Sequence, residues 1–160
     1  RESGKYSYMG MISKTFTTVD GDGSEFESGK GVTLKEGKDV AIIASGIMVD
    51  EALKAEEQLA AEGISAKVID MFTWKPLDEQ LIIDSAKECG AIVTAENHQV
   101  KCGLGSAIAN VVIQNCPVPM EMVGVEDRFG QVGAEGFLRE EYGLTAAHIV
   151  EAAKKAISRK

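Results

Sequence analysis

The segment 39–70 constrains the fold more than any other part of the chain. Val40–Ala44 is an unbroken apolar run, which is typical of a strand covered on both faces. In 49–62 the apolar residues fall on one stripe and the charged residues elsewhere, as in an amphipathic helix. Gly63 suits a left-handed helix end, and Ala66–Ile69 supplies a second apolar strand. Two buried strands joined by so short a helix predict a right-handed parallel crossover.

The rest of the chain continues this alternation of strands and helices. We expect strands at 30–35, 91–95 and 120–125, and helices at 79–89, 106–114, 135–142 and 145–157. Thr145 is the expected N-cap of the last helix. About five strands and five helices in alternating order predict an α/β sheet with helices on both faces.

Charge and cysteine content limit the classes of binding partner and the cellular compartment that we expect for this protein. The formal net charge is −8, and the excess lies in 39–100, where twelve acidic residues face four basic ones. We expect these acids on solvated helix faces. Without a basic stripe, no nucleic-acid partner is expected. The apolar runs are far shorter than the ~20 residues that span a bilayer, so no membrane partner is expected. Three cysteines without a CxxC motif favour a reducing, cytoplasmic location.

Polar residues follow the predicted strand at 91–95, where ligands bind in open α/β sheets. Glu96 and His98 have the side chains of an acid–base pair at this strand end. The alternative, which we favour, is that their hydrogen bonds order the loop. The sequence assigns no catalytic, cofactor-binding or metal-ligating residue in this chain.

A glycine-rich turn follows at 103–106. The run Gly103-Leu104-Gly105-Ser106 opens a helix after a strand, so its amides could hold a phosphate. Ile108 stands where a GxGxxG fingerprint needs its third glycine, and close packing of helix against sheet is the favoured alternative. Cys102 could be a reactive thiol or, as we favour, a small packing residue.

Several motifs, in this order, carry a family resemblance: 37–49, 51–53, 63–70, 75–78, 94–98, 103–106, 127–130, 142–145 and 148–149. Together they resemble the carboxyl-terminal domain of the transketolase family, from about Ser24 to the end. The chain is most similar to the separate carboxyl-terminal subunits of split bacterial and archaeal transketolases. Deoxyxylulose-phosphate synthase and the beta subunits of 2-oxoacid dehydrogenases share the domain more distantly.

The resemblance implies a three-layer α/β/α sandwich on a mixed five-stranded sheet with one antiparallel edge strand. It implies that 1–31 is an irregular lead-in from a preceding pyrimidine-binding domain and that 32–160 is the transketolase carboxyl-terminal domain. The whole enzyme would be a homodimer that moves two-carbon ketol units between sugar phosphates. Thiamine diphosphate and magnesium would bind between its pyrimidine- and pyrophosphate-binding domains, so this chain alone would hold no cofactor and be inert.

Two positions depart from the family pattern. Asn97 stands where members often have a second glutamate, and Cys102 where they often have a glycine. The glycine-rich turn also leaves a different interpretation open, in which the chain is an independent Rossmann-like module that binds a small ligand or nucleotide through Gly103–Ser106.

Overall fold

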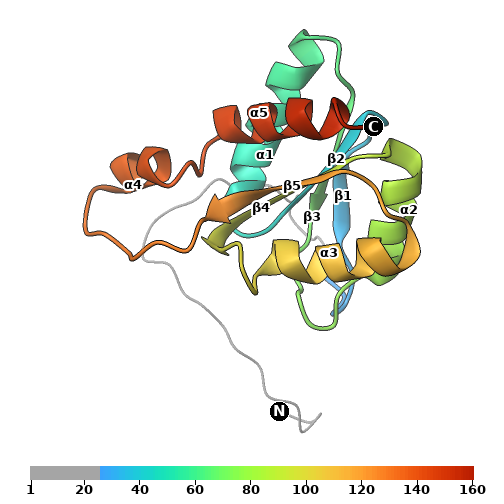
Figure 1. Ribbon diagram of the computed structural model, residues 1–160, viewed down its shortest axis with the longest axis horizontal. Coiled ribbons are helices and arrows are strands. Elements are labelled where there is room, and N and C mark those ends of the chain that lie inside the picture. Colours follow the sequence, from blue (N-terminus) through green and yellow to red (C-terminus); the bar gives the residue numbers. More distant parts are fainter. Residues whose placement is uncertain (1–25) are drawn as a thin grey trace, which may run out of the picture.

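Residues 26–160 are described by the computed structural model, and within them five strands form one twisted sheet (Figure 1). The strands are β1 (Val32–Lys35), β2 (Val40–Ala44), β3 (Ala66–Asp70), β4 (Ile92–Gln99) and β5 (Met120–Val125). Their order across the sheet is β1-β3-β2-β4-β5. The edge strand β1 runs antiparallel to β3, and the other neighbours are parallel. The mixed sheet with one antiparallel edge strand is thus confirmed.

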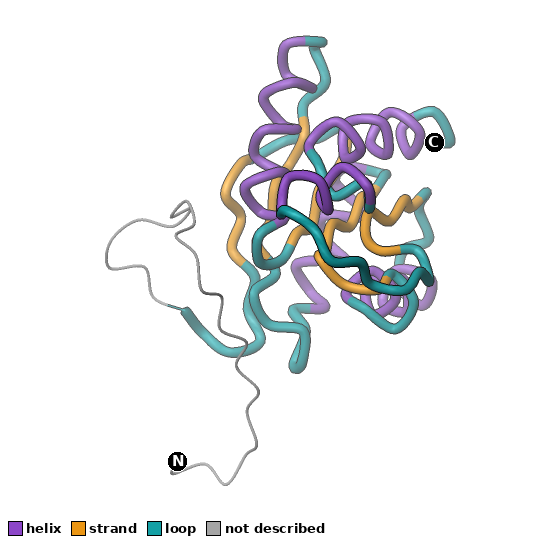
Figure 2. Tube along the Cα trace, turned by 90° about the vertical axis from the view of Figure 1, so that its left-hand side faces the viewer, coloured by secondary structure: helices purple, strands orange, loops and turns teal. Residues whose placement is uncertain are grey.

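Helices cover both faces of the sheet. They are α1 (Met48–Ala61), α2 (Glu79–Cys89), α3 (Leu104–Asn115), α4 (Glu135–Glu141) and α5 (Ala146–Ile157). Figures 1 and 2 show α1 and α5 on one face and α2 and α3 on the other. The connection from β2 to β3 runs in the opposite direction across the sheet from the connections that lead to β4 and β5. Crossovers of one hand therefore place α1 on one face and α2 and α3 on the other. The result is the expected three-layer sandwich.

The central strand β2 is the best-buried element, since all five of its side chains are inaccessible to solvent. Val40, Ile42 and Ala44 pack into the core beneath α1 and α5. Ala41 and Ile43 pack into the core beneath α2 and α3. An apolar side chain is thus required at every position, which explains the unbroken run in the sequence.

Some observed ends of strands and helices differ from those predicted from the sequence. The fourth strand extends to Gln99, and α3 begins at Leu104 rather than Ser106. Thr145 occupies the N-cap position of α5 but makes no side-chain cap; its hydroxyl lies 2.8 Å from Nδ1 of His148. The buried carboxylate of Glu51 instead accepts the Ala146 N–H at 2.8 Å.

Not all acids in 39–100 lie on solvated surfaces. Glu51, Asp70, Asp78 and Glu96 are each at least nine-tenths buried. Across the part of the chain described, no helix is long and apolar enough to cross a membrane. The predicted lead-in 1–31 falls mostly outside the described residues, which begin at Phe26.

Gly37 should be essential for stability. A β-carbon there would lie 2.2 Å from the backbone carbon of Ala66. We expect Gly37→Ala to lower the free energy of unfolding by about 3 kcal/mol, the upper range for overpacking, in urea denaturation. Gly136→Ala is the matched control because nothing lies within 4 Å of its new β-carbon. A Gly37→Ala protein as stable as the wild type would contradict the close approach.

Candidate functional site

Open α/β sheets bind ligands at the carboxyl ends of their parallel strands, so the candidate site lies at that edge of the sheet. The strand β2 lies between β3 and β4, so the connections after β2 and β3 leave in opposite directions. Side chains from three strand ends meet there: Trp74 Nε1 donates to Ser45 Oγ at 2.9 Å. The rings of Trp74 and His98 are edge to face, 5.8 Å apart. These three residues form a switch-point cluster.

Glu96 lies beneath this edge and faces the start of α3. Its carboxylate is 1 % exposed and accepts the Leu104 N–H at 2.7 Å and the Gly105 N–H at 2.8 Å. These amides belong to the first turn of α3, where amides have no partner within the helix. A buried carboxylate thus occupies the position at which a helix N-terminus binds an anion.

Gly103 and Gly105 make this contact sterically possible. A β-carbon on Gly103 would lie 2.1 Å from Glu96 Oε2. One on Gly105 would lie 2.7 Å from the hydroxyl oxygen of Thr94. The two glycines therefore bring the start of α3 against β4, and two of the amides of 103–106, those of Leu104 and Gly105, are bonded to the protein's own carboxylate.

Glu96 and His98 lie close together on β4 but differ in burial. Burial raises the pKa of the Glu96 carboxyl, while the two amide hydrogen bonds and the nearby His98 act in the opposite sense. Nδ1 of His98 lies 4.0 Å from the Glu96 carboxylate and 3.0 Å from the Gln99 carbonyl oxygen. The His98 side chain is 54 % exposed. Both carboxylate oxygens of Glu96 are engaged by amides, so the arrangement orders the loop more readily than it transfers a proton.

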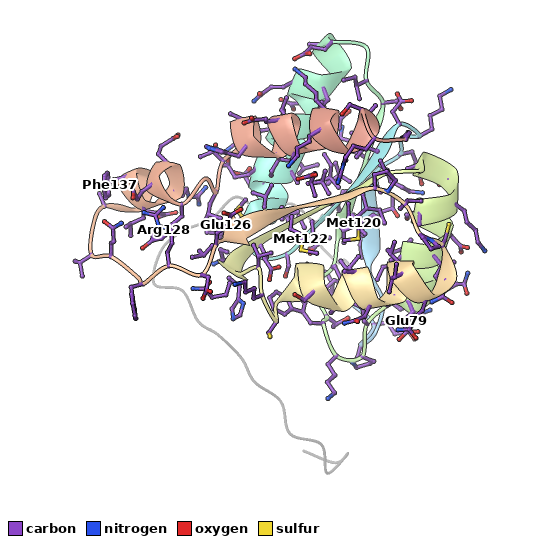
Figure 3. All side chains as sticks on the ribbon, in the orientation of Figure 1. Glu79, Met120, Met122, Glu126, Arg128 and Phe137 are labelled. Carbon is purple, nitrogen blue, oxygen red and sulfur yellow. The ribbon has the colours of Figure 1, made fainter. Side chains whose placement is uncertain are left out.

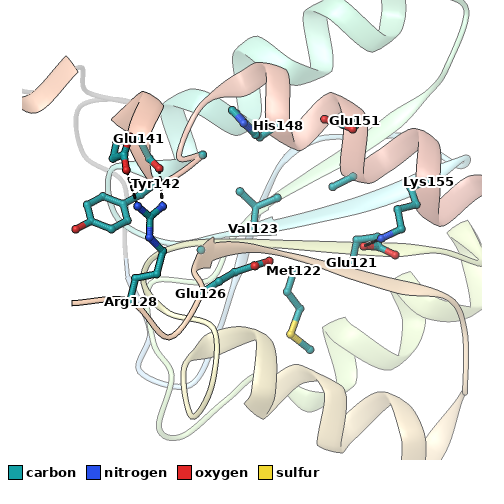
Figure 4. A pocket seen from close by; sticks show the side chains of 13 residues that line it. Glu121, Met122, Val123, Glu126, Arg128, Glu141, Tyr142, His148, Glu151 and Lys155 are labelled. Atoms are coloured by element: carbon teal, nitrogen blue, oxygen red, sulfur yellow. Dashed lines mark hydrogen bonds and ion pairs between the residues drawn. The ribbon is translucent and has the colours of Figure 1, made fainter. Parts of the chain in front are cut away.

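A cavity of about 320 Å³ lies between β5 and α5 (Figure 4). Charged side chains line much of it, and several are paired: Glu121 contacts Lys155 at 3.0 Å, and Arg128 forms an ion pair with Glu141. Three of the motifs that carry the family resemblance line this cavity, through Arg128, Tyr142, Gly143 and His148, but the sequence did not predict that they come together. Within residues 26–160, no group of three or more His, Cys, Asp or Glu side chains could hold a metal ion.

The geometry defines an α/β/α sandwich whose switch point is occupied by its own side chains. The chain belongs to the transketolase carboxyl-terminal domain family, whose model matches residues 29–149. The structure is similar to a solved chain described as a split gene transketolase, inactive beta4 tetramer. The TM-score is 0.88 at 49% sequence identity, over 90% of this chain and 47% of that one.

Curated relatives agree with this assignment. The 6-deoxy-6-sulfo-D-fructose transketolase subunit SqwH of Clostridium sp. (strain MSTE9) is 48% identical over 96% of this chain and 48% of its own length. The 1-deoxy-D-xylulose-5-phosphate synthase of Heliobacterium modesticaldum is 40% identical over 86% of this chain and 22% of its own length. The chain thus spans about half, or less, of the length of these relatives.

Replacing the Glu96 carboxylate should expose its structural role. In Glu96→Gln the side-chain NH₂ would face one of the two amides and leave a buried donor unpaired. We expect the free energy of unfolding to fall by about 1–3 kcal/mol. Hydrogen exchange at the Leu104 and Gly105 amides should accelerate. Glu57→Gln, on the exposed face of α1, should change stability by no more than about 0.5 kcal/mol. Unchanged exchange at both amides would refute the cap.

The three cysteines, all free, should differ in reactivity. Burial raises the pKa of the Cys89 thiol to about 11, and its Sγ donates to the Gly37 carbonyl at 3.4 Å. Cys102 is exposed. At pH 8 we expect iodoacetamide to modify Cys102 in the native protein and to leave Cys89 unmodified, as read by peptide mass spectrometry. In urea both should react, and equal native rates would contradict the burial of Cys89.

Proposed function

We propose that this chain is the carboxyl-terminal domain of a cytoplasmic, thiamine diphosphate-dependent transketolase. The whole enzyme transfers two-carbon ketol units between sugar phosphates and works as a homodimer. Residues 1–31 lead in from the pyrimidine-binding domain, and 32–160 form the carboxyl-terminal domain. The domain supplies structure and no catalytic residue, so the chain is inert by itself.

The family match over 29–149 carries this proposal. The switch point supports the inert role, because the amides that could receive a diphosphate are bonded to Glu96. We assign the binding of thiamine diphosphate and Mg²⁺ to the pyrimidine- and pyrophosphate-binding domains. The free cysteines are in keeping with a reducing cytoplasm.

A second candidate is the carboxyl-terminal domain of a 1-deoxy-D-xylulose-5-phosphate synthase, since such an enzyme is 40% identical to the chain over 139 residues. A 2-oxoacid dehydrogenase beta subunit is a more distant possibility. All three alternatives place the chemistry outside this domain. They differ in the product that the whole enzyme forms.

The inert role has a direct test. Calorimetric titration of the 160-residue chain with thiamine diphosphate and Mg²⁺ should give no binding heat, and the chain alone should not turn over a ketose. Binding in the micromolar range, about −8 kcal/mol, would refute the inert role.

The parent activity is tested in the enzyme assembled with its other domains. We expect ketol transfer from a ketose panel that includes 6-deoxy-6-sulfo-D-fructose, the sugar named for the Clostridium relative. Omission of thiamine diphosphate should abolish the transfer. Formation of 1-deoxy-D-xylulose 5-phosphate instead would favour the second candidate.

A further inference from the structure

The segment between β5 and α5 projects from the sandwich and carries the helix α4. Figure 1 shows α4 beyond the edge of the sheet, and Phe137 lies on this projecting part in Figure 3. Within α4 no residue is buried. A helix without buried apolar side chains is held to the core by little hydrophobic free energy, so we place α4 among the least stable parts of the fold.

The two ends of this projecting segment are joined to each other. The Tyr142 hydroxyl donates to the Phe129 carbonyl at 2.8 Å, and Arg128 forms an ion pair with Glu141. The Arg128 guanidinium also lies 5.2 Å from the centre of the Tyr142 ring. A surface loop whose ends are close and whose own side chains pack together behaves as a compact unit. We call residues 128–142 the strap.

The strap is fastened to the body of the domain by a partly buried ion pair. Arg139 on α4 contacts Glu51 on α1 at 3.0 Å. The Arg139 side chain is 21 % exposed and the Glu51 side chain 10 %, so dissolved ions screen this pair less than a pair on the surface. The same carboxylate accepts the Ala146 N–H at the start of α5. Glu51 therefore holds both α4 and α5 to α1, and we call the Glu51–Arg139 pair the latch.

The strap also forms one end of the cavity between β5 and α5. Arg128, Glu141 and Tyr142 line that end, and Val123 on β5 lines the same cavity (Figure 4). Tyr142 packs against the core cluster to which Val123 belongs, and Val123 is 7 % exposed. Movement of the strap away from the domain would remove Tyr142 from this core and open the cavity toward Val123.

We propose that the strap is a lid on this cavity, which the Glu51–Arg139 latch holds shut and which opens as one unit while the rest of the domain stays folded. Opening breaks the latch and displaces Tyr142, and it leaves the contacts between the two ends of the strap intact. The strap makes all these contacts within this chain, so the lid does not depend on the proposed function.

Hydrogen exchange in the native chain tests whether the strap opens by itself. The Leu138 and Tyr142 amides report on α4, since both donate to carbonyls within the strap, and the amides of β2 report on the whole fold. We expect exchange in α4 to be unchanged by low concentrations of urea and exchange in β2 to accelerate with urea. The same urea dependence in both elements would overturn the proposal.

Variants of the latch test what holds the strap. Arg139→Gln should accelerate exchange in α4 about tenfold and leave exchange in β2 unchanged. Arg139 also pairs with Glu135 within α4, so Glu135→Gln, which keeps the latch, is the control for fraying of the helix. Lys154→Gln removes a pair between α5 and Glu62 and is the control for the loss of a positive charge. An acceleration by either control as large as that by Arg139→Gln would overturn the latch.

Thiol labelling tests whether the strap controls access to the cavity. Iodoacetamide should modify the thiol introduced by Val123→Cys about tenfold faster when Arg139→Gln is also present, and at an unchanged rate when Lys154→Gln is present. Buried Cys89 should stay unmodified in each protein, which separates opening of the strap from unfolding of the domain. An unchanged rate with Arg139→Gln, or modification of Cys89 at the same rate, would overturn the lid.

Discussion

The contact between the Glu96 carboxylate and the first amides of α3 organises the carboxyl edge of this domain. It joins a central strand to a covering helix across a distance that only glycine at 103 and 105 permits. The same contact occupies the place where many α/β proteins bind a phosphate. One buried side chain therefore both ties two layers together and closes the switch point to an anion.

Buried carboxylates also accept backbone N–H groups in the first turns of two other helices, α5 and α2. Glu51 on α1 accepts the first amide of α5, which ties together two helices of the same layer. Asp78 accepts the Leu81 N–H at the start of α2 and also the Gly31 N–H before β1. Each carboxylate meets helix amides that the helix itself leaves unpaired. Part of the acidic excess in 39–100 is thus structural, and the rest remains on the surface.

Local sequence signals predicted the elements well where local physics decides them. The helix predicted at 79–89 has the bounds observed for α2, because the Asp78 cap and the left-handed Gly90 act within one turn. The apolar run in β2 correctly predicted a strand buried on both faces. Strand order, by contrast, was not predicted, and the antiparallel edge strand came only from the family resemblance, since periodicity does not say which strands are neighbours. The role of Glu96 depends on the direction of its side chain, and the cavity beside β5 depends on residues brought together by folding. Neither the direction of a side chain nor the assembly of a cavity from distant segments can be read from the spacing of residues in the sequence.

The outer edge of β5 is the last in the sheet and faces α5 across the cavity. Glu121 on that strand pairs with Lys155 and also with Arg159, 2.6 Å away, and Arg159 also donates to the Met120 carbonyl, so charge is concentrated at this margin of the sheet. Charged side chains at a sheet margin discourage the addition of foreign strands. Loss of the Glu121 carboxylate would remove both ion pairs from this margin and leave β5 more open to aggregation with a second chain.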